Sequence, residues 1–135
     1  MARLIDSNIW IDLARPKSSR ELKACAFRIA SSHGAALAEP VLFETLAYAS
    51  EGEVRKMRAL FDEYELLETP KDLWERATEL GRKCSLQGEP AGQMDLLIAT
   101  VAIHHDAEVV TFDAGMASIS NHSKLRVTLL PRPKS

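Results

Sequence analysis

Four acidic residues of this chain stand among apolar neighbours, where a carboxylate is hard to accommodate. Asp6 and Asp113 each follow a short run of apolar residues that is typical of a strand. Glu44 and Asp95 lie in stretches of helical character, and their neighbours three and four positions away lack charge. An ionised carboxylate removed from water must be compensated, or its pKa shifts and it becomes neutral. Four such residues in one chain point to a shared ligand.

A bound divalent cation is the simplest compensation for these charges. No Lys or Arg lies within helical reach of Glu44 or Asp95. Oxygen ligands without a His or Cys partner favour Mg²⁺ or Mn²⁺ over zinc. Carboxylates around one or two such ions activate water and stabilise the charge of a phosphodiester under attack. Ser7, Asn8 and Thr111 are expected to add two hydroxyls and an amide to the same site.

Each acid also has a structural interpretation. Asp6, Asp95 and Asp113 stand where helices are expected to start, and Asp is a preferred helix N-cap. Glu44 can be a carboxylate at the margin of the core. Two aspartates at the ends of two parallel strands nevertheless fall on the same edge of a sheet, where ligands bind. Asp12, four residues after Asn8, is expected to face solvent.

The elements that must position these acids alternate between strand and helix. The expected strands cover residues 3–6, 35–38, 66–69, 107–112 and 125–130. The expected helices cover residues 8–14, 18–33, 40–50, 51–65, 71–86, 92–105 and 114–120. This alternation predicts an α/β fold with a mostly parallel sheet covered on both faces. The apolar character of 92–105 nearly all round predicts a buried helix.

Composition places the chain among ordinary globular proteins. Its 135 residues are 46% hydrophobic and 27% charged, which favours a single domain over residues 1–135. No apolar run reaches the roughly 20 residues of a membrane span, so no membrane association is expected. Cys25 and Cys84 match no metal-ligand spacing and favour a reduced, cytoplasmic protein.

The net charge of −2 does not favour nucleic acid, but the charges are unevenly placed. Between residues 15 and 28 five basic residues face a single acid, Glu21. Such a stretch is either a surface that binds phosphates or the solvated face of a helix.

Four short motifs carry the acids in order along the chain. They are Asp6-Ser7-Asn8 after the first strand, Glu44 in "VLFETLAYAS", Asp95 in "MDLLIATVAI", and Thr111 with Asp113 in "VVTFDAGM". In this order and on these elements, the chain resembles the PIN-domain family, and within it the VapC-like ribonuclease toxins of toxin–antitoxin pairs. The likeness runs from residue 3 to residue 130. Members often carry a further acid and an aromatic after the fourth motif, whereas here Gly115 and Met116 follow.

The resemblance implies a three-layer α/β/α fold with a central parallel sheet of about five strands. It also implies a Mg²⁺- or Mn²⁺-dependent endoribonuclease, in which a metal-activated water attacks the RNA phosphodiester. Asp6, Glu44 and Asp95 would hold one ion, and Asp113 that ion or a second one. These four acids are therefore the expected catalytic and metal-binding residues.

The same resemblance implies partners. Members typically form homodimers, and a small antitoxin covers the acidic site, sometimes with an Arg inserted among the carboxylates. Basic residues around the pocket would contact RNA, and Arg15, Lys17 and Arg20 are the candidates. The shared acids do not specify which RNA is cut, because surface shape and loops read the RNA.

Two other functions compete with this one. A phosphoacceptor domain of receiver type is also α/β, but it needs an acidic pair after its first strand and a lysine after a late one. Here Asp6 stands alone, and no lysine closely follows residues 107–113. The second alternative is a PIN-fold module that binds RNA or protein without cutting. The presence of all four acids argues against it.

Overall fold

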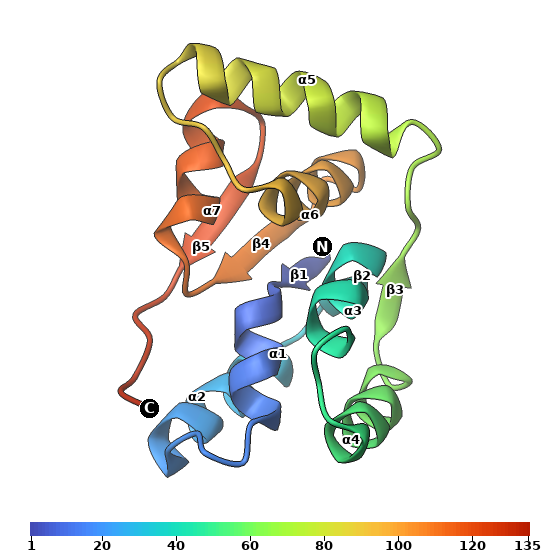
Figure 1. The fold of residues 1–135 in the computed structure, drawn as a ribbon, viewed down its shortest axis with the longest axis vertical. Coiled ribbons are helices and arrows are strands. Elements are labelled where there is room, and N and C mark those ends of the chain that lie inside the picture. Colours follow the sequence, from blue (N-terminus) through green and yellow to red (C-terminus); the bar gives the residue numbers. More distant parts are fainter.

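The computed structural model describes residues 1–135 and shows one sheet of five parallel strands flanked by seven helices (Figure 1). The strands are β1 (Arg3–Ile5), β2 (Ala35–Ala38), β3 (Glu65–Leu67), β4 (Glu108–Thr111) and β5 (Arg126–Leu129). The helices are α1 (Ser7–Ala14), α2 (Arg20–Ala30), α3 (Glu39–Leu46), α4 (Glu51–Phe61), α5 (Leu73–Leu86), α6 (Gln93–His104) and α7 (Ala114–Ile119), followed by a 3₁₀ turn, η1 (Ser120–His122). The α/β/α fold predicted from the sequence is confirmed.

The order of the strands reverses its direction at β1. The strands run in the order β3-β2-β1-β4-β5, and every neighbouring pair is parallel. The chain leaves β1 toward β2 on one side, while β4 lies on the other side. Ligands of open α/β sheets bind at the carboxyl ends of the strands at such a point. Ile5 pairs with Val110, so the next residues, Asp6 and Thr111, meet at this edge.

Local sequence signals explain where the helices begin and end. Ser19 caps α2 by accepting a hydrogen bond from the amide of Leu22 at 3.1 Å. Ser50 and Glu53 form a capping box at the start of α4. Pro40 occupies the first turn of α3, where its missing N–H costs nothing. The helices predicted for 18–33, 51–65 and 71–86 are two to four residues shorter at individual ends, where the chain forms caps and turns or, at Glu65, begins β3.

Trp10 ties the first helix to the rest of the core. Its side chain is 1% exposed, and its indole N–H donates to the carbonyl of Ile5 at 3.1 Å. Its ring meets the rings of Phe61 and Tyr64 edge to face, at centroid distances of 5.2 and 5.1 Å. The helix that starts at Asp6 is therefore fixed to both β1 and the end of α4.

Asp12 corrects one prediction. It is 4% exposed rather than solvated, and its carboxylate accepts hydrogen bonds from Nε and Nη2 of Arg132 at 2.8 and 3.0 Å. The partner lies 120 residues away in the chain, so no local spacing could indicate it.

Burial of α6 is confirmed for its middle, Ile98–Ala102, whereas its first turn is partly open. None of the helices has both the length and the apolar character to cross a membrane.

Candidate active site

Asp6 is both a helix cap and a buried carboxylate at the edge of the sheet. It is 3% exposed and lies between the end of β1 and the first turn of α1. Its Oδ1 accepts a hydrogen bond from the amide of Ser7 at 2.7 Å, and its Oδ2 accepts one from the hydroxyl of Thr111 at 2.7 Å. The structural and the chemical interpretations of this residue are therefore compatible.

Thr111 is the centre of the hydrogen bonds that fix Asp6. It is the last residue of β4 and is fully buried. While its hydroxyl donates to Asp6, its Oγ1 accepts from the side-chain amide of Asn8 at 3.1 Å and from the backbone amide of Asp113 at 2.9 Å. Asn8 and Thr111, expected as additional ligands, are thus engaged in holding a carboxylate. The hydroxyl of Ser7 is buried and has no hydrogen-bond partner in the chain.

Asp95 lies in the first turn of α6 and is half-buried. The N-cap of this helix is Gly92, and the helix has no side-chain cap. Capping therefore does not explain Asp95. Burial, as the largest cause, and the negative charges of Asp6, Asp113 and Glu44 together raise its pKa to about 7.

The pKa of Asp6 responds to the same group of charges. Its pKa is raised to about 6, with burial as the largest cause, although the hydrogen bonds from Thr111 and Ser7 lower it. The charges of Glu44 and Asp113 also raise it. Glu44 is half-buried on α3, and Asp113 is an exposed N-cap of α7. The charges of Glu44 and Asp113 therefore act on Asp6, and those of Asp6, Glu44 and Asp113 act on Asp95.

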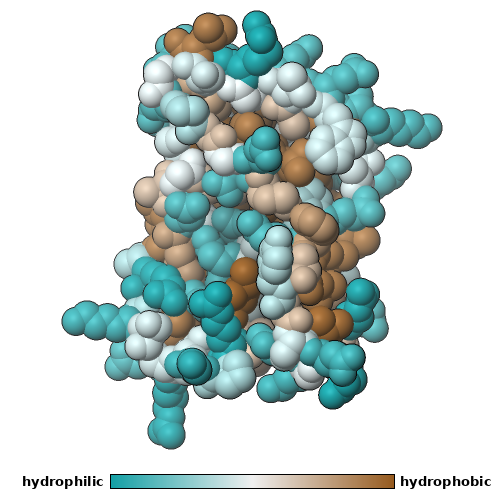
Figure 2. Space-filling view, in the orientation of Figure 1, coloured by the Kyte–Doolittle hydropathy of each residue, from teal (hydrophilic) through white to brown (hydrophobic).

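The four carboxylates suit a hard divalent cation in type and in charge, since they are oxygen donors that repel one another in its absence. They do not form a ready-made cage, because no three His, Cys, Asp or Glu side chains are disposed to hold a metal as they stand. The unpaired buried hydroxyl of Ser7 is a further polar group beside the acids. Hydrophilic residues run through the middle of the face shown in Figure 2, between α6 and α1.

The segment after the fourth acid has a structural role. Gly115 donates its amide to Oδ1 of Asp113 at 2.9 Å, and Met116 is fully buried in the core. Asp113 is therefore the only acid that this segment offers.

A family model described as PIN domain matches residues 3–121. The chain belongs to the PIN-domain family. Members of this family are generally nucleases. No curated protein matches the chain.

Solved structures of toxin–antitoxin complexes share this PIN fold. A chain of the VapBC2 complex from Rickettsia felis, bound to a DNA fragment of its promoter, has a TM-score of 0.74 at 19% identity, covering 96% of this chain and 99% of that one. DNA-bound VapBC from Salmonella typhimurium gives 0.73 at 18% identity, covering 95% and 97%. VapBC-1 from nontypeable Haemophilus influenzae gives 0.70 at 18% identity, covering 96% and 98%.

The basic residues predicted to contact phosphates are all on the surface. Arg15 is the C-cap of α1, Lys17 lies in the connection that follows, and Arg20 opens α2, and all three are exposed. The sequence analysis missed Arg132, which binds α1 from the end of the chain. The basic run "PRPKS" at residues 131–135 was the available signal.

Proposed function

We propose that this PIN-domain protein is a VapC-like toxin, a Mg²⁺- or Mn²⁺-dependent endoribonuclease. The observation that carries the proposal is the buried carboxylate of Asp6 at the switch point of the sheet, whose pKa, like that of Asp95, is raised by burial and by the charges of the other acids. A protein keeps such charges together when they bind a cation. Membership of a nuclease family supports phosphodiester hydrolysis as the reaction.

Asp6, Glu44 and Asp95 would hold one ion, and Asp113 would hold that ion or a second. A divalent ion bound there would lower the pKa of water and neutralise charge on the phosphodiester. The chain itself fixes the direction of the Asp6 carboxylate through Ser7 and Thr111. It also keeps this carboxylate out of bulk water, which strengthens its electrostatic interactions. No side-chain nucleophile is required.

Incubation of purified protein with total cellular RNA tests this proposal. The reactions contain Mg²⁺, Mn²⁺ or EDTA, and the Asp95→Asn variant runs beside the native chain. Discrete fragments that need metal and disappear in Asp95→Asn support the nuclease. Intact RNA with a folded native chain under every metal would instead favour a module that binds RNA or protein without cutting.

An antitoxin partner belongs to the same proposal. The support comes from the solved structures of similar fold, which are toxin–antitoxin complexes. A basic side chain from such a partner would neutralise the charge of these carboxylates.

We also propose that the protein is cytoplasmic, because the free thiols of Cys25 and Cys84 suit a reducing compartment. Residues 1–135 act as one domain in this proposal.

A homodimer is the proposed assembly. A groove of about 1060 Å³ lies between α3, α5 and the start of α6. Phe43 and Trp74 line it and are 65% and 70% exposed. Large aromatic side chains concentrate in interfaces, and a two-fold contact uses the same surface of both copies. A surface that carries both a groove and projecting aromatics can therefore receive a second copy of this chain.

A further inference from the structure

One face of α1 leads from the acidic site to the end of the chain. Asn8, Asp12 and Arg15 are spaced by four and three residues, so they lie along the same side of the helix. Asn8 is in the site, where its amide binds Thr111. At about 1.5 Å per residue, Arg15 lies about 10 Å farther along the axis. This face is a straight path away from the carboxylates.

Arg132 is attached to the middle of this face. Its Nε and Nη2 donate to the two oxygens of Asp12, whose side chain is 6% exposed. The side chain of Arg132 itself is 40% exposed. A guanidinium has five N–H donors, so about three remain free for another partner. Asp12 thus holds the arginine in a fixed plane while its outer edge stays open.

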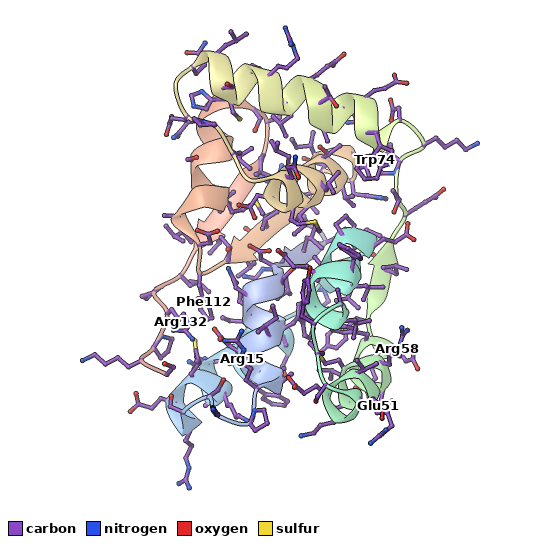
Figure 3. All side chains as sticks on the ribbon, viewed as in Figure 1. Arg15, Glu51, Arg58, Trp74, Phe112 and Arg132 are labelled. Carbon is purple, nitrogen blue, oxygen red and sulfur yellow. The ribbon has the colours of Figure 1, made fainter.

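A second contact fixes the segment that follows Arg132. The hydroxyl of Ser19, the N-cap of α2, donates to the backbone carbonyl of Lys134 at 2.7 Å. Figure 3 shows Phe112, Arg132 and Arg15 following one another beside α1. The end of the chain therefore brings two cations to the stretch that already carries three. The resulting basic track consists of Arg15, Lys17, Arg20, Arg132 and Lys134.

The charge of this track contrasts with that of the whole chain. Two acids accompany it, of which Asp12 is buried under Arg132 and Glu21 is exposed on α2. The chain as a whole has a net charge of −2. Cations along a face that begins at the acidic site solve a problem of the proposed reaction, since RNA phosphates must approach an acidic site.

We propose that residues 130–134 complete an RNA-binding track, in which Arg132, held by Asp12, contacts a phosphate of single-stranded RNA leading to the carboxylates. The proposal rests on the proposed function and names how that site receives its substrate. A guanidinium held in a plane suits phosphate oxygens, which it can bind with two N–H groups at once. The five side chains of the track are all cationic donors, which favours a phosphate chain as the partner.

The chain offers a matched control for the Asp12–Arg132 pair. Arg126 and Asp106 form another Arg–Asp pair at 2.6 Å. Arg126 opens β5 and Asp106 precedes β4, so this pair lies at the amino ends of the strands, opposite the acidic site. The double variants Asp12→Asn/Arg132→Gln and Asp106→Asn/Arg126→Gln make the same change of charge at the two edges of the sheet. Neither leaves a buried carboxylate unpaired.

Both double variants are made on Asp95→Asn, which prevents cleavage during binding. The probe is a short fluorescein-labelled single-stranded RNA, and fluorescence anisotropy gives its Kd across a series of KCl concentrations. We expect Asp12→Asn/Arg132→Gln to weaken binding about 5- to 10-fold and to reduce the slope of log K against log[salt] by about 0.7. The pair at the opposite edge should change neither quantity.

Equal affinity of both double variants and their parent overturns the track, as does an equal loss in both. If Asp12→Asn/Arg132→Gln loses its circular dichroism spectrum, Lys134→Gln replaces it, because Ser19 binds the backbone carbonyl of Lys134, which this substitution keeps. A comparable loss of RNA affinity in Lys134→Gln supports the track, and unchanged RNA affinity in this variant overturns it. Cleavage by the native chain with Mg²⁺ is measured in parallel. Native cleavage with unchanged variant binding overturns the track alone, whereas a native chain that neither binds nor cleaves RNA overturns the proposed function as well.

Discussion

The hydroxyl of Thr111 donates a 2.7 Å hydrogen bond to Oδ2 of Asp6, across the junction of β1 and β4. This bond joins residues 105 positions apart in the sequence at the point where the sheet reverses its order. It lowers the pKa of Asp6, but burial has the larger, opposite effect, and the resulting pKa is about 6. Thr111 is therefore a positioning residue, which acts on the site through the carboxylate that it holds.

Thr111→Val should reduce cleavage while the fold is kept. The substitution preserves shape but leaves Asp6, Asn8 and the amide of Asp113 without their common partner. We expect a cost of about 1–3 kcal/mol in the free energy of unfolding. We also expect kcat/KM to fall at least about tenfold and its acidic limb to move to higher pH, because Asp6 loses a bond that lowers its pKa. Initial rates on labelled RNA between pH 5 and 9 measure both effects.

Thr100→Val is the control for a purely structural effect. Thr100 is 2% exposed, and its hydroxyl donates only to the carbonyl of Leu96 in its own helix. Thr100→Val should leave the pH profile of kcat/KM unchanged. Thr111→Ser, which keeps the hydroxyl, should restore the native profile. If the pH profile of kcat/KM for Thr111→Val matches the native profile, Thr111 does not control the protonation state of Asp6.

Without metal, the protein should lose stability as the pH rises from about 5 to about 8. Asp6 and Asp95 have pKa values raised to about 6 and about 7 in the fold, against 3.8 for an ordinary aspartate. In this range the folded chain binds more protons than the unfolded chain, so the free energy of unfolding decreases with rising pH. After allowance for the exposure of Asp95, the loss is about 2–4 kcal/mol. Urea unfolding in EDTA at several pH values measures it, and a flat or rising curve contradicts the prediction.

Asp95→Asn should stabilise the metal-free protein at pH 8. The substitution removes a charge that is disfavoured by burial and by Asp6, Asp113 and Glu44. Because the group is partly exposed, we expect a gain of about 1–2 kcal/mol. Asp62→Asn, at the exposed C-cap of α4, is the control and should change stability by less than about 0.5 kcal/mol. Excess Mg²⁺ should raise the Tm of the native chain more than that of Asp95→Asn.

The sequence alone predicted what local spacing controls. The alternation of apolar runs and helical periods predicted the five strands, and the four acids were selected as candidates because each sits among residues that cannot neutralise it. Contacts between distant segments were not predictable in this way. Arg132 meets Asp12 only because the end of the chain returns to α1, and Thr111 was expected as a ligand rather than as the support of Asp6. Both are properties of the packing of segments, which periodicity does not encode.

Arg132→Gln should destabilise the fold because it leaves the buried carboxylate of Asp12 without its partner. We expect a loss of about 2 kcal/mol, less than for a fully buried pair since the arginine is partly exposed. Asp12→Asn added to Arg132→Gln should recover most of this loss, because no buried charge then remains. Thermal unfolding of Asp12→Asn, Arg132→Gln and the double variant gives the coupling free energy between the two residues. Additive losses in the double variant would contradict a pair that acts as one unit.

Trp74→Glu should convert the protein from a dimer to a monomer. Trp74 is 70% exposed beside the groove between α3 and α5, where burial of its ring against a second copy would contribute strongly to association. A charge placed there would have to be desolvated in the dimer, so the dimer becomes unstable while the exposed position leaves the fold intact. Sedimentation velocity at several protein concentrations measures the change in mass.

Tyr48→Glu separates an effect of the groove from a general effect of removing surface aromatics. Tyr48 is 96% exposed and lies outside the groove, so its loss removes an aromatic side chain and adds the same charge without touching the proposed contact. If Tyr48→Glu stays dimeric while Trp74→Glu is monomeric, the groove is the contact surface. A dimer that survives Trp74→Glu at low micromolar concentration must use another face, because a buried glutamate at the centre of an interface is not tolerated without a cationic partner.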